Sequence, residues 1–274
     1  MRYPKGSIQL RESHDIPLLR QLVSSEFVTH SQLFEFMKLK HFERSRSSFN
    51  WRIRRLVQRE LVLQRSTAVA SGDVTYSAAK TAIVLLQGTG EYCLFDYDRI
   101  LGRGLDRQIV HAIELNAIHL SVLRGGSLVR WIYSTEIRSQ NELTDFGFAK
   151  DYDAVVTMNN AGREYRLALE YERSPKAAKF YRAIAGAISD EGQVGHVLYL
   201  VSNYDLLRYI SGFFAPARRV LFGLVRDWHR QLLNMPVYDG SMNRPFSLAH
   251  ALTGCSVRAA SVNIPLPFGN SPSF

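Results

Sequence analysis

Three successive segments in the first third of the chain carry apolar residues at the spacing of an amphipathic helix, after a polar stretch at residues 1–14. Thr29 or Ser31 has the right side chain to cap the second segment, and the third runs from about Ser45 to Glu60. We expect the apolar positions to form the buried face of each helix. In order, they are Leu18, Leu19 and Leu22; Leu33, Phe34, Phe36 and Met37; and Phe49, Ile53, Leu56 and Val57.

A hairpin pattern follows the third helix. Leu61–Arg65 is typical of a strand, Ser71-Gly72-Asp73 of a turn, and Val74–Tyr76 of a returning strand. A further helix is predicted over Ala78–Leu86. Three helices followed by a two-stranded hairpin predict a winged helix-turn-helix domain at residues 15–90.

The rest of the chain has a different pattern. A glycine-rich stretch between about Gly88 and Gly104 predicts a junction, and residues 105–126 predict a helix ended by Gly125 and Gly126. Short apolar runs then alternate with amphipathic ones in the order strand, strand, strand, helix, strand, helix, strand. These runs are 129–136, 153–158, 165–172, 175–188, 196–202, 204–214 and 218–225. The order predicts a mixed sheet flanked by helices at 105–235, followed by a Pro-, Gly-, Ser- and Asn-rich segment at 236–274.

The charge of the chain favours an acidic partner. The net charge is +9 and the isoelectric point is about 9.7, which is typical of proteins that bind nucleic acid. From Glu43 to Arg65 there are seven arginines and two glutamates. We predict that the start and outer face of the third helix contact double-stranded DNA through Arg44, Arg46, Ser47, Asn50, Trp51, Arg54 and Arg55. The alternatives are a solvated basic face and a winged helix that binds protein.

Cysteine usage and the hydropathy of the chain predict a cytoplasmic location. Only two cysteines occur, Cys93 and Cys255, without metal-ligand spacing, as expected of reduced thiols. The first residues lack the apolar core of a signal peptide, and no stretch approaches the roughly 18 apolar residues of a membrane span. We therefore expect no membrane partner.

Three carboxylates flank the second and third predicted strands. Asp153 begins one strand, and Glu170 and Glu172 lie near the end of the next, beyond a predicted turn at residues 159–162. Strand alternation puts Glu170 and Glu172 on one face. Carboxylates that converge at one sheet end would suit Mg²⁺, which could activate water for phosphodiester cleavage, with Glu114 as a possible fourth acid. The alternative is that they are merely solvated, or that Glu172 pairs with Arg173 or Lys176.

Several segments together resemble the replication-relaxation family of plasmid and mobile-element proteins. They are "YSAAKTAIVLL", "HAIELNAIHLSVL", "DAVV…RLALEYER…KAAKFY", "VLYLVS" and "VLFGLV", in this order, and the resemblance covers roughly residues 15–235. It implies a winged helix followed by a domain similar to the PD-(D/E)XK nuclease core.

The resemblance also implies roles for individual residues. Asp153 and Glu170 match the two acids of the nuclease pattern, which would hold the metal. The lysine of that pattern should follow Glu170 by two residues, but Glu172 stands there. Lys176 or Lys179 would then have to supply the ammonium group from the following helix.

Three functions fit these features. The first is a DNA-binding accessory protein of plasmid or mobile-element replication, relaxation or mobilisation, with a degenerate nuclease-like domain. The second is an active Mg²⁺-dependent DNA endonuclease, and the third is a transcriptional regulator whose second domain dimerises or senses a ligand. We expect a homodimer that binds double-stranded DNA and replication or mobilisation proteins.

Overall fold

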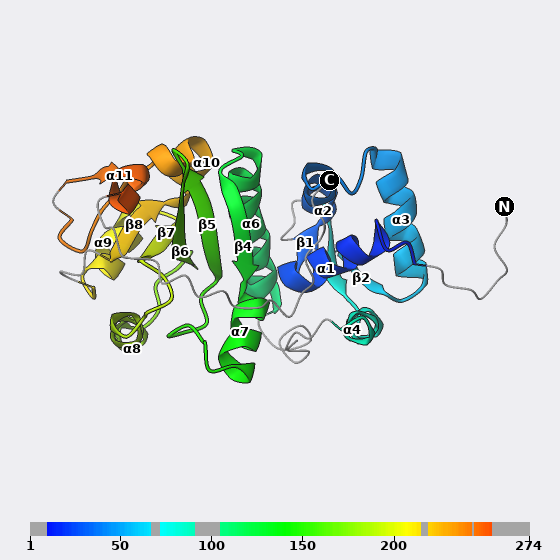
Figure 1. The fold of residues 1–274 in the computed structure, drawn as a ribbon, viewed down its shortest axis with the longest axis horizontal. Helices are drawn as coiled ribbons and strands as arrows, with labels where there is room; N and C mark the ends of the chain where they lie inside the picture. Colours follow the sequence, from blue (N-terminus) through cyan, green and yellow to red (C-terminus); the bar gives the residue numbers. More distant parts are fainter. Residues whose placement is uncertain (1–9, 67–71, 91–104, 215–218, 243, 254–274) are drawn as a thin grey trace. The chain divides into compact units, whose positions relative to one another are not determined.

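The computed structural model describes residues 10–66, 72–90, 105–214, 219–242 and 244–253 (Figure 1). The described chain divides into two compact units, and the division falls inside helix α6 (Leu105–Arg124), between residues 113 and 114. It does not fall before residue 105, where the sequence pattern predicted it. Several features of the sequence lie outside the described residues: Ser71 of the predicted turn, Cys93, Cys255, and residues 1–9, 91–104 and 254–274.

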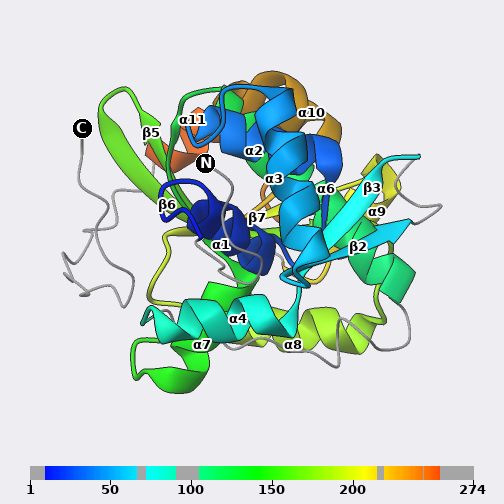
Figure 2. The ribbon, with the colours of Figure 1, turned by 90° about the vertical axis from the view of Figure 1, so that its right-hand side faces the viewer.

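The first unit contains helices and a small antiparallel sheet. Its elements are α1 (Asp15–Ser25), β1 (Val28–Thr29), α2 (His30–Leu39), α3 (Arg46–Gln58), β2 (Val62–Ser66), β3 (Val74–Ala78) and α4 (Lys80–Gly88). The strand order is β1-β3-β2. Figure 2 shows α3 beside the β2–β3 hairpin. The short strand β1, which pairs with β3, was not predicted, because two residues carry no periodic signal.

The predicted helix faces of this unit are largely confirmed. Most of the predicted apolar positions are buried, whereas Phe34 and Val57 are partly exposed. Thr29, rather than Ser31, caps α2: its hydroxyl accepts the N–H of Gln32, whose side chain in turn accepts the N–H of Thr29. Ser45 caps α3 in the same position.

The second unit contains a mixed sheet of five strands in the described part of the chain. The strand order is β4-β5-β6-β7-β8. The first three strands are antiparallel, and β6, β7 and β8 are parallel. Besides the second part of α6, the unit contains β4 (Leu128–Tyr133), α7 (Ser134–Leu143), β5 (Ala154–Asn160), β6 (Arg163–Glu172), α8 (Ala178–Ser189), β7 (His196–Val201), α9 (Tyr204–Ser211), β8 (Val220–Leu224), α10 (Val225–Gln231), a 3₁₀ turn at Leu232–Asn234, β9 (Pro236–Val237), β10 (Phe246–Ser247) and α11 (Leu248–Thr253).

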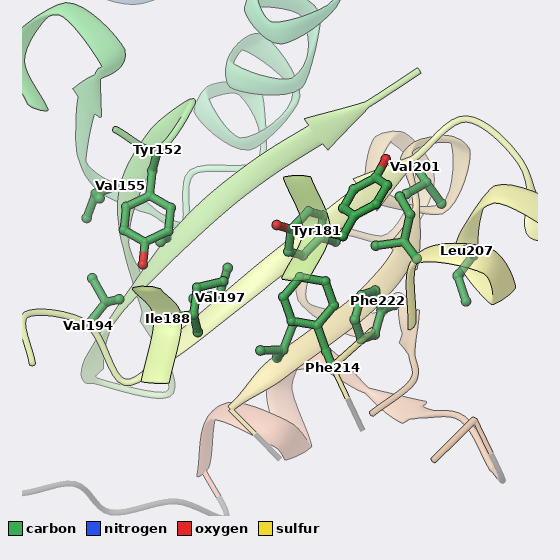
Figure 3. Packing of buried hydrophobic residues seen from close by; sticks show 14 of the residues in the cluster. Tyr152, Val155, Tyr181, Ile188, Val194, Val197, Val201, Leu207, Phe214 and Phe222 are labelled. Carbon is green, nitrogen blue, oxygen red and sulfur yellow. The ribbon is translucent and has the colours of Figure 1, made fainter. Parts of the chain in front are cut away.

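Helices cover both faces of this sheet. Apolar residues of α7, α8 and α9 pack on one face, where Tyr181, Ile188 and Leu207 meet Val197 and Phe222 (Figure 3). On the other face the core includes Ile118 and Val122 of α6, Trp228 of α10, and Leu248 and Leu252 of α11. The mixed sheet flanked by helices is therefore confirmed.

Two details of the second unit differ from the sequence prediction. Residues 134–136, predicted as the end of a strand, begin α7 instead. The unit also continues past residue 235, because Val237, Leu248 and Leu252 are buried in its core. Within the described residues, no helix is both long and apolar enough to cross a membrane.

The hairpin turn between β5 and β6 is confirmed and fixes their register. Ala161 and Gly162 both have positive φ angles, 51° and 81°, as a type I′ turn requires. Asn160 pairs with Arg163, and Ala154 pairs with Leu169 at the other end of the ladder. The same register, continued by one residue, sets Asp153 opposite Glu170.

Candidate functional site

The outer face of α3 is basic and exposed. Phe49, Ile53 and Leu56 hold the helix against the core, so the residues between them face solvent. Of the seven residues predicted to contact DNA, six are exposed: Arg44, Arg46, Ser47, Asn50, Trp51 and Arg54. Trp51 is 56% exposed, which is high for an indole ring.

Arg55, the seventh predicted contact, has a different environment. Its guanidinium is half-buried, forms an ion pair with the fully buried Asp15 and stacks over the Trp51 ring at 4.9 Å. The expectation that Arg55 points away from the core is therefore wrong. Arg52 is also buried, with ion pairs to Asp15 at 2.7 Å and to Glu43. Both arginines are needed by the buried acids, so the exposed positive charge of α3 comes from Arg46 and Arg54, with Arg44 just before the helix.

Asn50 takes part in a chain of polar contacts. His30 Nε2 lies 3.0 Å from Asn50 Oδ1, and His30 Nδ1 lies 3.2 Å from the Tyr76 hydroxyl. The His30 ring packs edge-on against Phe49, with ring centroids 5.1 Å apart. A cavity of about 400 Å³ opens beside these groups, lined on one side by α3 and on the other by the hairpin. Asn50, Arg54, Gln64, Asp73 and Tyr76 are among its lining residues.

The three predicted acids of the second unit come together on one face of its sheet. Asp153 stands opposite Glu170, and its carboxylate accepts the N–H of Tyr171 at 2.8 Å. Glu170 and Glu172 are both only 4% exposed. They share the face of β6 that α7, α8 and α9 cover, because Ala168, two residues before Glu170, belongs to that core.

Each buried glutamate already has a lysine partner. Lys150, which the sequence analysis did not single out, forms an ion pair with Glu170, and Lys176 forms one with Glu172. This pairing of Glu172 is one of the alternatives left open by the sequence. Lys179 is exposed, with its ammonium 5.2 Å from the Phe180 ring centre, and among the described residues it forms no ion pair with the acids. The only sequence signal for Lys150 was its position just before Asp153.

Burial and charge act in opposite directions on these groups. Burial raises the pKa of Glu170 to about 7; the Lys150 ammonium opposes this rise, and the Asp153 carboxylate adds to it. Burial tends to lower the pKa of Lys176, but the Glu172 carboxylate outweighs it and the pKa is raised. These shifts indicate that the lysines and acids form one electrostatic cluster.

Tyr199 borders the acids. It pairs with Glu170 across the β6–β7 ladder and is fully buried. Its hydroxyl has no hydrogen-bond partner among the described residues. Burial raises the pKa of this phenol, and the neighbouring carboxylates of Glu170, Glu172 and Asp153 raise it further. Tyr199 therefore stays neutral and contributes a hydroxyl group to the acid cluster.

Glu114 does not join this cluster. It lies 3.9 Å from Arg173 and raises the pKa of Tyr171. Tyr171 packs in the core on the opposite face of the sheet from Ala168. Glu114 therefore belongs to that other face, and its proposed role as a fourth acid beside Glu170 is wrong.

Two of the three acids are engaged by lysines in this arrangement. Within the described ranges, no group of three or more His, Cys, Asp or Glu side chains is placed to hold a metal ion. Lys150 and Lys176 occupy the carboxylates that Mg²⁺ would need. Within the cluster, the two lysines offset the charges of the two glutamates.

Comparison of the chain with protein-family models, with curated proteins and with solved structures finds no match.

Proposed function

We propose that this protein binds double-stranded DNA through its first unit, a winged helix, and acts as an accessory factor in plasmid or mobile-element replication, relaxation or mobilisation. The observation that carries the proposal is the exposed basic face of α3, with Arg46, Asn50 and Arg54 directed to solvent. Guanidinium and amide groups on an exposed helix are suited to phosphate and base-edge contacts.

The element order of the first unit supports the same proposal. A helix, a short strand, two helices and a hairpin follow one another, with β1 completing a three-stranded sheet. In a winged helix this order presents the third helix to the major groove. The assignment to the replication-relaxation family rests on the sequence resemblance.

The test is a binding titration with labelled duplex DNA. The double variant Arg46→Ala with Arg54→Ala should weaken binding by roughly tenfold or more, since each lost contact costs about 1–3 kcal/mol. The matched control is Arg230→Ala, which removes an exposed arginine from α10 of the second unit and should leave affinity nearly unchanged. Equal affinity of wild type and the double variant would refute the assignment of α3.

For the second unit we propose a nuclease-like domain that does not cleave DNA. The mixed sheet, with β7 and β8 parallel to β6, supports the nuclease-like part. The ion pairs of Lys150 and Lys176 with the two glutamates support the inactive part. Incubation of the protein with supercoiled plasmid and Mg²⁺ or Mn²⁺ should give binding without nicking.

One observation favours the active alternative. Asp153 stands opposite Glu170, and Lys150 supplies an ammonium group beside them. The two acids of the nuclease pattern therefore have a lysine next to them, although this lysine is not the one that the pattern expects two residues after Glu170. Metal-dependent nicking that is lost in Asp153→Ala, with DNA binding intact, would establish the endonuclease and refute the inactive domain.

A further inference from the structure

A cavity of about 630 Å³ lies in the second unit, next to the carboxyl ends of the parallel strands β6 and β7. One wall is the loop that follows β6, and the other is the start of α9, which follows β7. Because the two strands are parallel, both segments leave the sheet at the same edge, where sheets of this kind commonly bind ligands. Arg173, Pro175, Lys176, Asp205, Leu206 and Tyr209 are among the residues that line the cavity.

Hydrogen bonds hold the two walls of this cavity in place. The N–H of Ser202 donates to the carbonyl of Glu172 at 3.3 Å, and its hydroxyl donates to the carbonyl of Arg173 at 3.0 Å. The side chain of Asn203 caps α9 by accepting the N–H of Leu206 at 2.9 Å. The cavity is therefore formed before any ligand arrives, which lowers the entropy that binding costs.

Tyr209 supplies an aromatic ring that is both anchored and exposed. Its ring packs nearly perpendicular to those of Phe213 and Tyr181, with centroids 5.2 and 6.0 Å apart. Its hydroxyl donates to the carbonyl of Lys176 at 3.5 Å, across the loop that forms the opposite wall. Tyr209 is nevertheless 42% exposed. A ring held in this way can stack on a flat ligand with little loss of its own freedom.

Arg173 supplies the positive charge of the cavity. Its side chain is 51% exposed, and its ion pair with Glu114 spans 3.9 Å between two groups that solvent reaches, so this pair is weak. Lys176 is engaged by Glu172, and the carboxylate of Asp205 also lines the cavity. An anion would therefore bind on the side of Arg173, where a guanidinium can form two parallel hydrogen bonds to a phosphate.

We propose that this cavity binds an unpaired strand of DNA, with a base stacked on Tyr209 and a phosphate paired with Arg173. A nucleotide combines the flat face that the ring requires with the negative charge that the guanidinium requires. An acidic peptide would use Arg173 alone, and the bases of a duplex are stacked on one another, out of reach of the ring. The inference adds a second binding site to the proposed duplex-binding face of α3 and does not depend on it.

The experiment is a fluorescence-anisotropy titration with labelled oligothymidylate. All proteins carry Arg46→Ala with Arg54→Ala, so that α3 contributes little to binding. Tyr209→Leu and Arg173→Ala should each weaken binding roughly tenfold, and Tyr209→Phe, which keeps the ring, should bind like its parent. The matched controls are Phe146→Leu and Arg230→Ala, which alter an exposed ring and an exposed arginine outside the cavity lining; both should leave affinity nearly unchanged.

A second measurement needs no variant and stays valid if Tyr209→Leu does not fold. Ultraviolet crosslinking of wild type to an iodouracil-substituted single strand, followed by mass spectrometry, should attach the strand to Tyr209; crosslinks confined to the first unit would overturn the inference. Unchanged affinity in both Tyr209→Leu and Arg173→Ala, or equally tight binding of polyglutamate or of oligouridylate, would overturn it too. Failure of wild type to bind duplex DNA would instead refute the proposed role of α3, so the two failures can be told apart.

Discussion

Glu170 is the residue at which burial and charge conflict most directly. Its carboxylate is buried beside Asp153, and the Lys150 ammonium, with a smaller contribution from Lys176, opposes the effect of burial. An acid whose pKa in the folded state is raised stabilises the fold below its unfolded pKa, and this stability is lost as the pH rises through the folded value. Here that window extends from about 4.5 to about 7.

The variant Glu170→Gln should remove this pH dependence. We expect the free energy of unfolding of wild type to fall by the order of 2 kcal/mol between pH 5 and pH 8 relative to Glu170→Gln. Urea unfolding at a series of pH values measures it. Parallel pH profiles for the two proteins would mean that Glu170 titrates near its usual pKa and that the burial argument is wrong.

Lys150 should be more important to stability than Lys176. Lys150 is 18% exposed in its side chain and Lys176 is 49% exposed, so solvent screens the second ion pair more strongly. Lys150→Met leaves a buried carboxylate without its cation, and the loss should be about 2 kcal/mol or more at pH 8. Lys176→Met should cost less than 1 kcal/mol. Chemical denaturation at pH 8 compares the two, and equal losses would contradict this order.

At the scale of elements, α3 depends on a buried charge network as well as on its apolar face. Arg52 joins α3 to Asp15 at the start of α1 and to Glu43 in the loop before α3. Burial opposes the ionisation of Asp15, but hydrogen bonds from the Arg11 N–H and from Arg52 hold its pKa below the usual value. The network fixes the position of the helix that carries the proposed DNA contacts.

Removal of Arg52 should therefore destabilise the first unit. Arg52→Met removes the ion-pair partner of the buried Glu43 and leaves the buried Asp15 with Arg55 as its cation, and the expected loss is about 3–5 kcal/mol. Arg54→Ala, the matched change two residues further along the same helix, removes an exposed side chain and should alter stability by less than about 0.5 kcal/mol. Thermal unfolding distinguishes the two, and a stable Arg52→Met protein would show that the network is dispensable.

Sequence periodicity predicted the long helices and strands, but it did not predict the residues that depart from the pattern. Leu18, Leu22, Phe49 and Leu56 lie at helical spacing and are buried, because one apolar face per helix is enough to specify its orientation. The pattern also predicted the β5–β6 turn, since Gly162 readily adopts the positive φ angle that it has there.

The exceptions are residues whose partners are distant in sequence. Periodicity classed Arg55 as an outward-facing residue, but its partner Asp15 lies 40 positions earlier. Lys150 reaches Glu170 across the β5–β6 hairpin, and His30 reaches Asn50 from another helix. Pairings of this kind depend on the tertiary arrangement, which a spacing pattern does not contain. The candidate acids could be predicted, therefore, but the groups that neutralise them could not.

At the scale of the whole molecule, the net charge of +9 is distributed between two units that we propose to differ in role. Exposed arginines of α3 face solvent in the first unit, whereas the lysines of the acid cluster in the second unit are occupied by glutamates. Total charge alone would attract DNA to any basic surface. A defined interface on α3 can be distinguished from general attraction by measuring how the salt dependence of DNA binding changes when particular arginines are removed.

The salt dependence of DNA binding provides the last prediction. Each phosphate contact releases counterions and contributes about −0.9 to the slope of log affinity against log salt concentration. The double variant Arg46→Ala with Arg54→Ala should therefore make the slope shallower by about 2 if both side chains contact phosphates. Arg230→Ala should leave the slope unchanged although it also removes a positive charge. Titrations between low and moderate salt measure the slopes, and equal changes for arginines of the two units would show that binding follows net charge and not the surface of α3.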